Sequence, residues 1–393
     1  MKMMFYRREY KKTQTPVKRA AFAPPFQKGA LAALLLILCL VIMSSCTFIS
    51  VQEDMFFTMD TIAETTIITR KSETGKEANE RIREICEEIE GRISHTVQSE
   101  IMTLNAILMR SDNALLSYEL SKETAGLLET AKYMKEQTGG AFNPNLGALI
   151  DMWGLNSKHS YINEEHKLPE RDAFYPALEK IQNSDYEIIQ AEDNFYINSD
   201  ILSAFDLGAI GKGYAIDEIS DYLVDAGIPN ALVSFGSSIL AAGKNKSGEL
   251  WTIGLKDPLN PDDKNKISGY INATDKVISV SGGYERFITI NGRDYCHIID
   301  PETGYPVDND LLCVVVVMSS QSALQTKSQR EKFINNGAIS DALSTALYVM
   351  GKEKALNFYN NSHLDFEMIL FVKDNSPRGY DIIPTNVIFT EMK

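Results

Sequence analysis

Apolar residues recur every three or four positions in four stretches of the chain, which predicts amphipathic helices. In the first stretch, Ile82, Ile85, Ile89 and Ile93 would share one helix face. Glycines follow the other three stretches and are expected to end them, because glycine readily takes the left-handed conformation of a helix C-terminus. The helices are expected at roughly 76–93, 122–138, 212–226 and 340–350.

Short runs rich in β-branched and apolar residues lie between these helices and predict strands. The predicted strands are residues 231–235, 250–255, 277–280, 286–290, 312–318, 368–372 and 386–390. Helices and strands do not alternate with the regular period of a parallel sheet. The pattern therefore favours an α+β domain with mixed or antiparallel sheets.

The amino-acid composition and the net charge exclude several classes of protein. The chain has 393 residues, of which 44% are apolar and 23% charged, so neither wholesale disorder nor a multi-span membrane protein is expected. The formal net charge is −14, but residues 1–45 carry eight basic residues and one acidic residue, which leaves −21 on the rest. An acidic body excludes electrostatic capture of nucleic acid. An anionic ligand would have to be held locally by a metal, a few cations or backbone amides.

The N-terminus has the pattern of an export signal. A basic stretch over 1–28 precedes an apolar run over 30–43, which spans about 21 Å as a helix and is too short for the ~30 Å hydrocarbon core. Ser44 and Ser45 then precede Cys46, as in a bacterial lipoprotein. We expect a signal peptide at 1–45, lipidated Cys46, a tether over 46–57 and a folded domain over 58–393. An uncleaved signal anchor is the alternative, and both place the domain outside the cytoplasm on a membrane.

The remaining cysteines show no metal or disulfide pattern. Cys86, Cys296 and Cys313 have no paired spacing, and the chain has five histidines without a zinc-type arrangement. We expect these three cysteines to be buried apolar residues.

Residues 206–215 combine glycines with one cation. Gly208, Gly211 and Gly213 would let the backbone approach a ligand, the amides of the following helix could bind phosphate oxygens, and Lys212 adds a positive charge. The spacing does not match a P-loop, because Asp206 stands where the first glycine would be. A tight turn between a strand and a helix is the alternative interpretation.

Two later segments combine turns with reactive side chains. Residues 281–287 place two glycines beside Tyr284, Glu285 and Arg286, which also suits a simple hairpin. In residues 295–306, Asp300 and Thr303 are typical of a turn whose side chains bind nearby amides. His297 lies at the end of a strand before this turn. It is a candidate general base with an ordinary pKa near ~6.5, and the alternative is a structural histidine.

Asp341 and Thr345 are four residues apart at the start of a predicted helix. A carboxylate and a hydroxyl on one helix face suit a cation that prefers oxygen ligands, such as Mg²⁺. The alternative is an acidic residue that stabilises the helix N-terminus beside a packed threonine.

Taken together, these segments resemble the ApbE family of FAD:protein FMN transferases from about residue 59 to residue 351. The motifs that carry the resemblance are residues 99–101, 104–105, 138–144, 153–154, 206–215, 281–284, 297–304 and 341–345. Residues 59–61 differ from the family pattern, because Asp60 replaces a glycine. Residues 325–337 form a longer connection than the family pattern needs.

The resemblance implies two α/β subdomains with an FAD cleft between them. It also implies that FAD is cleaved with Mg²⁺, that FMN is joined to a Thr or Ser of a target redox protein, and that AMP is released. His297 would be the catalytic base. The implied FAD contacts are Met59, Ala141, Phe142, Asn143, Asp206, Lys212 and Ile298, and the implied Mg²⁺ ligands are Ala209, Asp341 and Thr345.

Two other functions fit the same residues. An FAD pyrophosphatase would use water as the acceptor and release FMN and AMP. A non-catalytic FAD-binding lipoprotein would store or carry the flavin. The presence of Asp341, Thr345 and His297 favours catalysis over storage.

Overall fold

The computed structural model describes residues 49–95, 98–110, 116–155, 166–199, 204–263, 265–320 and 336–392. The predicted signal peptide, Cys46 and nearly all of the long connection at 325–337 lie outside the described residues. Within them, no helix combines the length and apolar character needed to cross a membrane.

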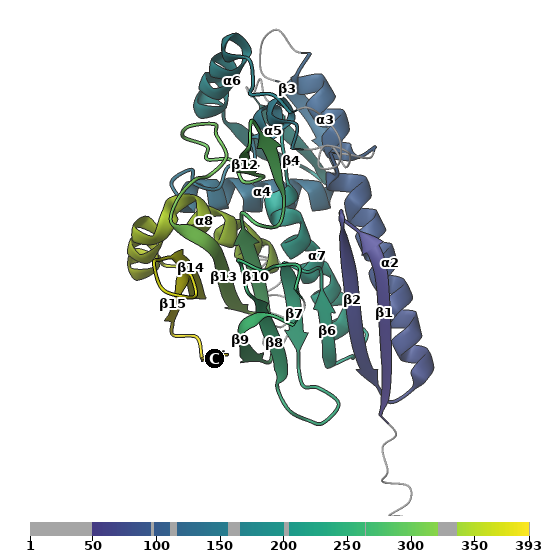
Figure 1. Ribbon diagram of the computed structural model, residues 1–393. Helices are drawn as coiled ribbons and strands as arrows, with labels where there is room; N and C mark the ends of the chain where they lie inside the picture. Colours follow the sequence, from purple (N-terminus) through teal and green to yellow (C-terminus); the bar gives the residue numbers. More distant parts are fainter. Residues whose placement is uncertain are drawn as a thin grey trace, which may run out of the picture. The chain divides into compact units, whose positions relative to one another are not determined.

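A large antiparallel sheet runs through the centre of the domain (Figure 1). Its strand order is β1-β2-β6-β7-β10-β13-β14-β15. The strands span Ser50–Thr58 (β1), Thr61–Thr69 (β2), Asn230–Ser234 (β6), Ser238–Ala242 (β7), Lys276–Gly282 (β10), Leu311–Ser319 (β13), Glu367–Lys373 (β14) and Tyr380–Thr385 (β15). Strand β2 pairs with β6 in this order, so the sheet brings segments 162 to 170 residues apart into contact.

Three helices cover one face of this sheet. They are α2 (Ser72–Ile93), α7 (Gly208–Asp225) and α8 (Asn336–Asn361), and their inner faces meet the sheet in the main apolar core. Gly351, with φ 72°, breaks α8 at the position where the sequence predicts its end. Helix α7 likewise ends just before Gly227, with φ 66°.

A small sheet covers the opposite face. It has the order β16-β9-β8 and consists of Phe389–Glu391, Ile267–Ala273 and Trp251–Lys256. Trp251 and Ile271 from this sheet pack with Val315 and Phe371 of the large sheet. Strand β13 is therefore buried on both faces, which explains why it is a continuous apolar run rather than an alternating one.

The remaining elements gather beyond one end of the large sheet (Figure 1). They are α3 (Glu100–Leu108), β3 (Leu116–Leu120), α4 (Lys122–Gln137), α5 (Gly147–Trp153), α6 (Arg171–Asn183), β4 (Tyr186–Ala191), β5 (Asn194–Ser199), β11 (Phe287–Ile290) and β12 (Arg293–Cys296). Helix α4 contacts α8, and the two regions share one apolar core. The prediction of an α+β fold is confirmed, and from Ile49 onward the chain forms one unit.

The structure corrects two boundaries. Residues 50–57, expected to be tether, form most of the edge strand β1, which pairs with β2 from Ser50–Thr69 to Thr58–Thr61. The strand is hard to recognise because Asp54 lies on its inner side, where it binds Arg83 of α2 at 2.6 and 2.9 Å. Helix α7 begins at Gly208 rather than near residue 212, so the glycine-rich segment is helix rather than a connecting turn.

Helices α7 and α8 meet backbone to backbone at Gly213 and Gly337. A Cβ atom on Gly213 would lie 2.0 Å from the Gly337 carbonyl oxygen and 2.7 Å from the Asp341 Cβ. A Cβ atom on Gly337 would lie 2.4 Å from the Gly213 carbonyl oxygen. The Asp217 carboxylate of α7 accepts hydrogen bonds of 2.8 Å from the Gly337 and Ala338 amides, and so caps α8. Any side chain at either glycine would push the helices apart.

Gly213→Ala should therefore destabilise the protein by about 1–3 kcal/mol, the usual cost of overpacking a tight core contact. Denaturant unfolding of the variant and the wild type measures this difference. Gly91→Ala is the matched control, because Gly91 is also helical but a Cβ there has no neighbour within 4 Å. The control should be neutral or stabilised by up to about 1 kcal/mol. Equal stability of the two variants would contradict the close helix contact.

Candidate active site

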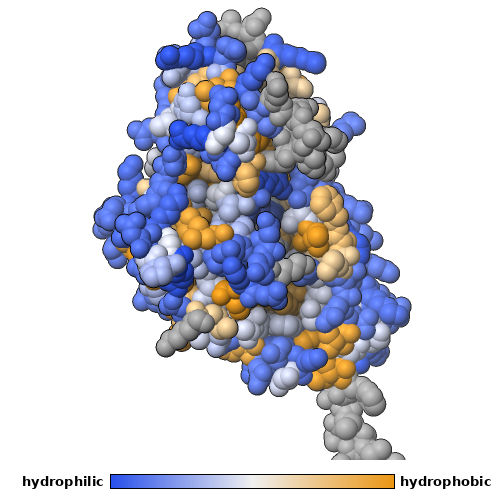
Figure 2. All heavy atoms as spheres, in the orientation of Figure 1, coloured by the Kyte–Doolittle hydropathy of each residue, from blue (hydrophilic) through white to orange (hydrophobic). Residues whose placement is uncertain are grey.

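A cavity of about 570 Å³ opens among the β1–β2 turn, the start of α7, the end of β10, the segment after β12 and α8. This volume is typical of a small-molecule site. Figure 2 shows that the face presented in Figure 1 is mostly hydrophilic, with apolar groups in separate patches. All eleven site residues expected from the family resemblance line this cavity: Met59, Ala141, Phe142, Asn143, Asp206, Ala209, Lys212, His297, Ile298, Asp341 and Thr345. Their individual roles stay predictions.

The Asn105 side chain holds the backbone of the segment that leads into α7. The Asn105 side-chain amide donates to the Phe205 carbonyl at 2.8 Å, and its oxygen accepts from the Phe205 amide at 2.7 Å. Asp206 follows, and its carboxylate accepts from the Gly208 amide at 2.9 Å. The second Asp206 oxygen lies 3.4 Å from His95 Nδ1. These bonds fix the first turn of α7, in which Gly208 and Ala209 line the cavity.

The segment carrying Ala141, Phe142 and Asn143 is positioned from α4. Thr138 Oγ1 donates to the Met134 carbonyl at 2.7 Å and accepts from the Phe142 amide at 3.1 Å. Gly139 and Gly140 have φ values of 60° and 85°, which lets the chain reverse direction directly after the helix. Phe142 is buried, and Ala141 packs against the main core.

Asp341 is the most strongly held carboxylate of the site. It is 3% exposed, and its two oxygens accept from the Gly213 amide at 3.0 Å and from Ser238 Oγ at 3.1 Å. Burial raises the pKa of Asp341, while the Lys212 charge and these hydrogen bonds oppose the rise. In a regular helix the Gly213 amide would donate to the Ala209 carbonyl. Its bond to Asp341 competes with that helical bond.

The oxygens near Asp341 suit a hard cation. Thr345 lies one helical turn after Asp341, and its Oγ1 is 3.1 Å from Ser281 Oγ. The described residues hold no group of three or more His, Cys, Asp or Glu side chains that could bind a metal. The set of one carboxylate, one hydroxyl and the Ala209 carbonyl contains only oxygen, which fits Mg²⁺ and does not fit zinc.

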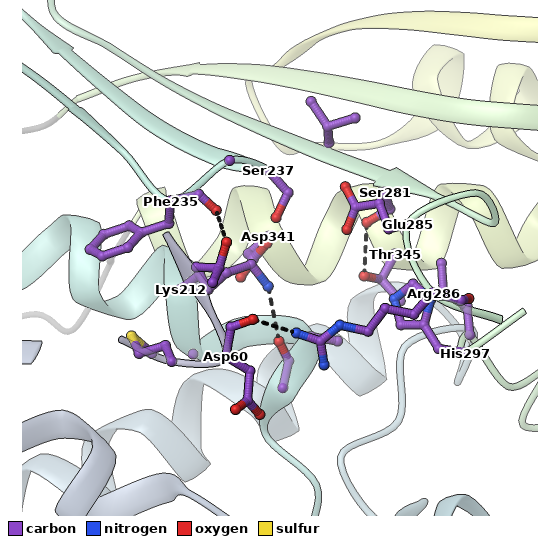
Figure 3. A pocket seen from close by; sticks show the side chains of 18 of the residues that line it. Asp60, Lys212, Phe235, Ser237, Ser281, Glu285, Arg286, His297, Asp341 and Thr345 are labelled. Atoms are coloured by element: carbon purple, nitrogen blue, oxygen red, sulfur yellow. Dashed lines mark hydrogen bonds between the residues drawn. The ribbon is translucent and has the colours of Figure 1, made fainter. Parts of the chain in front are cut away.

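His297 directly follows β12 and faces the same cavity (Figure 3). Its Nδ1 lies 3.1 Å from the Arg286 carbonyl, to which its own amide also donates at 3.0 Å. The carbonyl can only accept, so Nδ1 carries the proton and Nε2 keeps its lone pair. Burial, helped by the Arg286 and Lys212 charges, lowers the pKa of His297 to about 4. The imidazole is therefore neutral at pH 7, and its pKa lies well below the value near ~6.5 that the sequence predicts.

The turn after His297 has the predicted form. The Asp300 carboxylate accepts from the Glu302 amide at 2.9 Å and from Thr303 Oγ1 at 3.1 Å. Trp153 Nε1 donates to the Gly304 carbonyl at 2.9 Å, which fixes the turn to α5. The motifs at 153–154 and 300–304 are therefore distant in the sequence but in direct contact in the structure.

Several residues in or behind the cavity have no role assigned from the sequence. Ser238 does not line the cavity but donates to Asp341, and the Ser-rich turn after residues 231–235 is the signal that could have identified it. Glu285 and Arg286 were noticed as charges in a hairpin without a function. Asp60 and Arg286 are joined across the cavity, because Arg286 Nη2 donates to the Asp60 carbonyl at 3.0 Å (Figure 3).

The sequence of this chain is similar to those of known proteins. The ApbE family model matches residues 59–370. A curated protein of Treponema pallidum (strain Nichols), named FAD:protein FMN transferase, is 30% identical over 284 residues, which are 66% of this chain and 70% of that protein. Its namesake from Escherichia coli (strain K12) is 26% identical over 267 residues, 67% of this chain and 70% of that protein.

Solved structures agree in fold. The ApbE protein of Thermotoga maritima superposes with a TM-score of 0.68 at 25% identity, covering 86% of this chain and 97% of that one. The flavin transferase ApbE of Vibrio cholerae gives the same TM-score at 22% identity, covering 86% and 98%. The fold, the cavity and the family match lead to one conclusion, that this chain belongs to the ApbE family.

Proposed function

We propose that this protein transfers FMN from FAD to a Thr or Ser hydroxyl of a target redox protein, with Mg²⁺, and releases AMP. The FAD:protein FMN transferase activity follows from the family and from relatives that share most of the chain. The observation that carries the site assignment is His297, whose Nδ1 is engaged and whose Nε2 is left to act in the cavity that also holds Lys212 and Asp341.

His297 would act as the base. A Thr or Ser hydroxyl is almost fully protonated at neutral pH, so its oxygen needs a base when it attacks phosphorus. The bond between the acceptor oxygen and the FMN phosphorus forms, the bond from that phosphorus to the AMP oxygen breaks, and the hydroxyl proton passes to His297 Nε2. The bond from Nδ1 to the Arg286 carbonyl keeps the ring oriented during this transfer.

Lys212 and the first turn of α7 would bind the pyrophosphate. Among the described residues, Lys212 Nζ makes one hydrogen bond, a long one of 3.5 Å to the Gly208 carbonyl, and no salt bridge, so the amine can contact a ligand. The first amides of an 18-residue helix add partial positive charge at the same place.

Asp341, Thr345 and the Ala209 carbonyl would hold Mg²⁺, which when bound neutralises phosphate charge during phosphoryl transfer. The buried Asp341 is suited to this role because Gly213 and Ser238 fix its orientation before any ligand arrives. A bound cation would also offset the cost of burying this carboxylate, which its raised pKa reflects.

The proposal includes a location. The basic and apolar pattern of residues 1–45 and the small residues before Cys46 support export and a lipid anchor on the outer face of the bacterial cell membrane. The domain would then act on a target protein held at the same membrane.

His297→Gln should slow FMN transfer by roughly 100- to 10,000-fold, because it removes a general base and leaves FAD binding nearly unchanged. Mass spectrometry of an acceptor domain with FAD and Mg²⁺ measures transfer, and free FMN with AMP would reveal hydrolysis instead. Wild-type kcat/KM should fall as the pH drops through about 4, where His297 becomes protonated. The pH profile of the variant should lack this acid limb.

His363→Gln is the matched control, since His363 is exposed and outside the cavity. A structural role for His297 would produce a different result. Thermal stability and FAD affinity would then fall together, and the acid limb would persist in the variant.

Asp341→Asn should abolish the rise in melting temperature that Mg²⁺ gives the wild type, because an amide replaces the only carboxylate ligand. Thermal unfolding with and without Mg²⁺ measures this, with Asp308→Asn as a control at an exposed site. Activity should collapse and recover in part at high Mg²⁺, through Thr345 and the Ala209 carbonyl. A preserved Mg²⁺ effect on the melting temperature would place the ion elsewhere.

Cys46→Ala should leave the precursor uncleaved and detach the protein from its normal membrane fraction. N-terminal mapping of the mature wild type, together with cell fractionation, tests this. Cys86→Ala, a change at a buried cysteine of α2, should be processed normally. A mature wild-type chain that starts at any residue other than Cys46 would overturn the prediction.

A further inference from the structure

Two cations, Lys212 and Arg286, line the same cavity. Neither Lys212 nor Arg286 forms an ion pair with any described residue, although both belong to a body with a net charge of −21. Glu285 and Asp341 also line the cavity. The Lys212 charge acts on both carboxylates and the Arg286 charge on Glu285, but no salt bridge joins them among the described residues. Two cations that face one cavity without a salt bridge are suited to hold an anionic ligand.

Arg286 is held in a fixed orientation by both ends. Its carbonyl accepts from the His297 amide and faces His297 Nδ1, so its backbone is part of the base's support. Its Nη2 donates to the Asp60 carbonyl at 3.0 Å across the cavity. This is the single hydrogen bond that the guanidinium makes to the described residues, and four of its five N–H groups stay available. Figure 3 shows the side chain extended between His297 and Asp60.

A guanidinium that is fixed in this way suits a phosphate better than a flexible ammonium does. Its planar set of donors can bind two phosphate oxygens at once, and little side-chain freedom remains to be lost on binding. Positive groups beside the reacting phosphorus also stabilise the charge on its oxygens during transfer.

We propose that Arg286 is a further catalytic residue that binds the phosphate of the FMN half of FAD, the group that is transferred. The assignment to the FMN phosphate follows from His297. The base must lie beside the phosphorus that the acceptor oxygen attacks, and Arg286 adjoins His297 through two backbone contacts. The AMP phosphate leaves on the opposite side of that phosphorus, toward the remaining cation, Lys212. This inference rests on the proposed role of His297 in the transferase.

Calorimetry with FMN and with riboflavin isolates the phosphate contact, because the two ligands differ only by the phosphate. In the wild type without Mg²⁺, FMN should bind more tightly than riboflavin. Arg286→Gln should reduce this FMN-to-riboflavin affinity ratio by roughly 10- to 150-fold, the effect of a lost charge-assisted contact. Riboflavin and AMP affinities should stay near those of the wild type. Arg286→Lys should restore part of the ratio.

Arg293→Gln is the matched control. Arg293 lies on the same hairpin, is exposed, and already pairs with Asp308 at 2.8 Å, so its loss should leave the ratio unchanged. In the transfer assay, Arg286→Gln should lower kcat, and added guanidinium ion should recover part of it.

Three results would overturn the proposal. An unchanged FMN-to-riboflavin ratio would show that Arg286 does not touch this phosphate. A loss of AMP affinity alone would assign Arg286 to the leaving group. Equal losses for riboflavin and FMN would show that it only braces the Asp60 turn. Because these are binding measurements, they stay interpretable even if transfer activity itself is absent.

Discussion

The active site depends on how closely α7 and α8 approach each other. Only because Gly213 and Gly337 lack side chains can the Gly213 amide reach the Asp341 carboxylate at 3.0 Å. That bond holds the start of α7 against the turn of α8 that carries Asp341 and Thr345. The Asp217 carboxylate secures the same contact from the other side by capping α8. A single helix pair therefore provides both the stability of the core and the proposed cation ligands.

The sequence predicted the elements whose local pattern agrees with their surroundings, such as α2 with its isoleucine face and the apolar runs of β10, β13 and β14. It failed where a tertiary contact decides the structure. Three glycines in six residues argue against a helix, yet residues 208–213 are helical, and at Gly211 and Gly213 the helix packs too closely against Ile93 and Gly337 to leave room for a side chain. The sequence predicts a tether where strand β1 lies, because an inward-facing Asp54 is not typical of a strand. Its pairing with Arg83 of α2 explains the orientation of Asp54.

The same distinction applies to the site. Residues inside short motifs could be named from the sequence, because glycine, lysine, histidine and aspartate have specific chemistry at those spacings. Contacts between distant segments could not be predicted from the sequence. Ser238 binds Asp341 across 103 positions, and Arg286 binds the Asp60 carbonyl across 226. No local pattern records such a contact, so Arg286 looked like an ordinary hairpin charge until the fold placed it opposite the β1–β2 turn.

The charges of the cavity would couple ligand binding to the protonation of His297, the proposed base. Burial is the main cause of the low pKa of His297, and the charges of Arg286 and Lys212 lower it further. A bound pyrophosphate would neutralise these cations and thereby favour the protonated imidazole. The pKa of His297 would then rise toward neutrality only when FAD is present, which is when the base must accept a proton. Under this proposal, an acidic protein would bind an anionic substrate with a few cations, and the same cations would set the pKa of the proposed base.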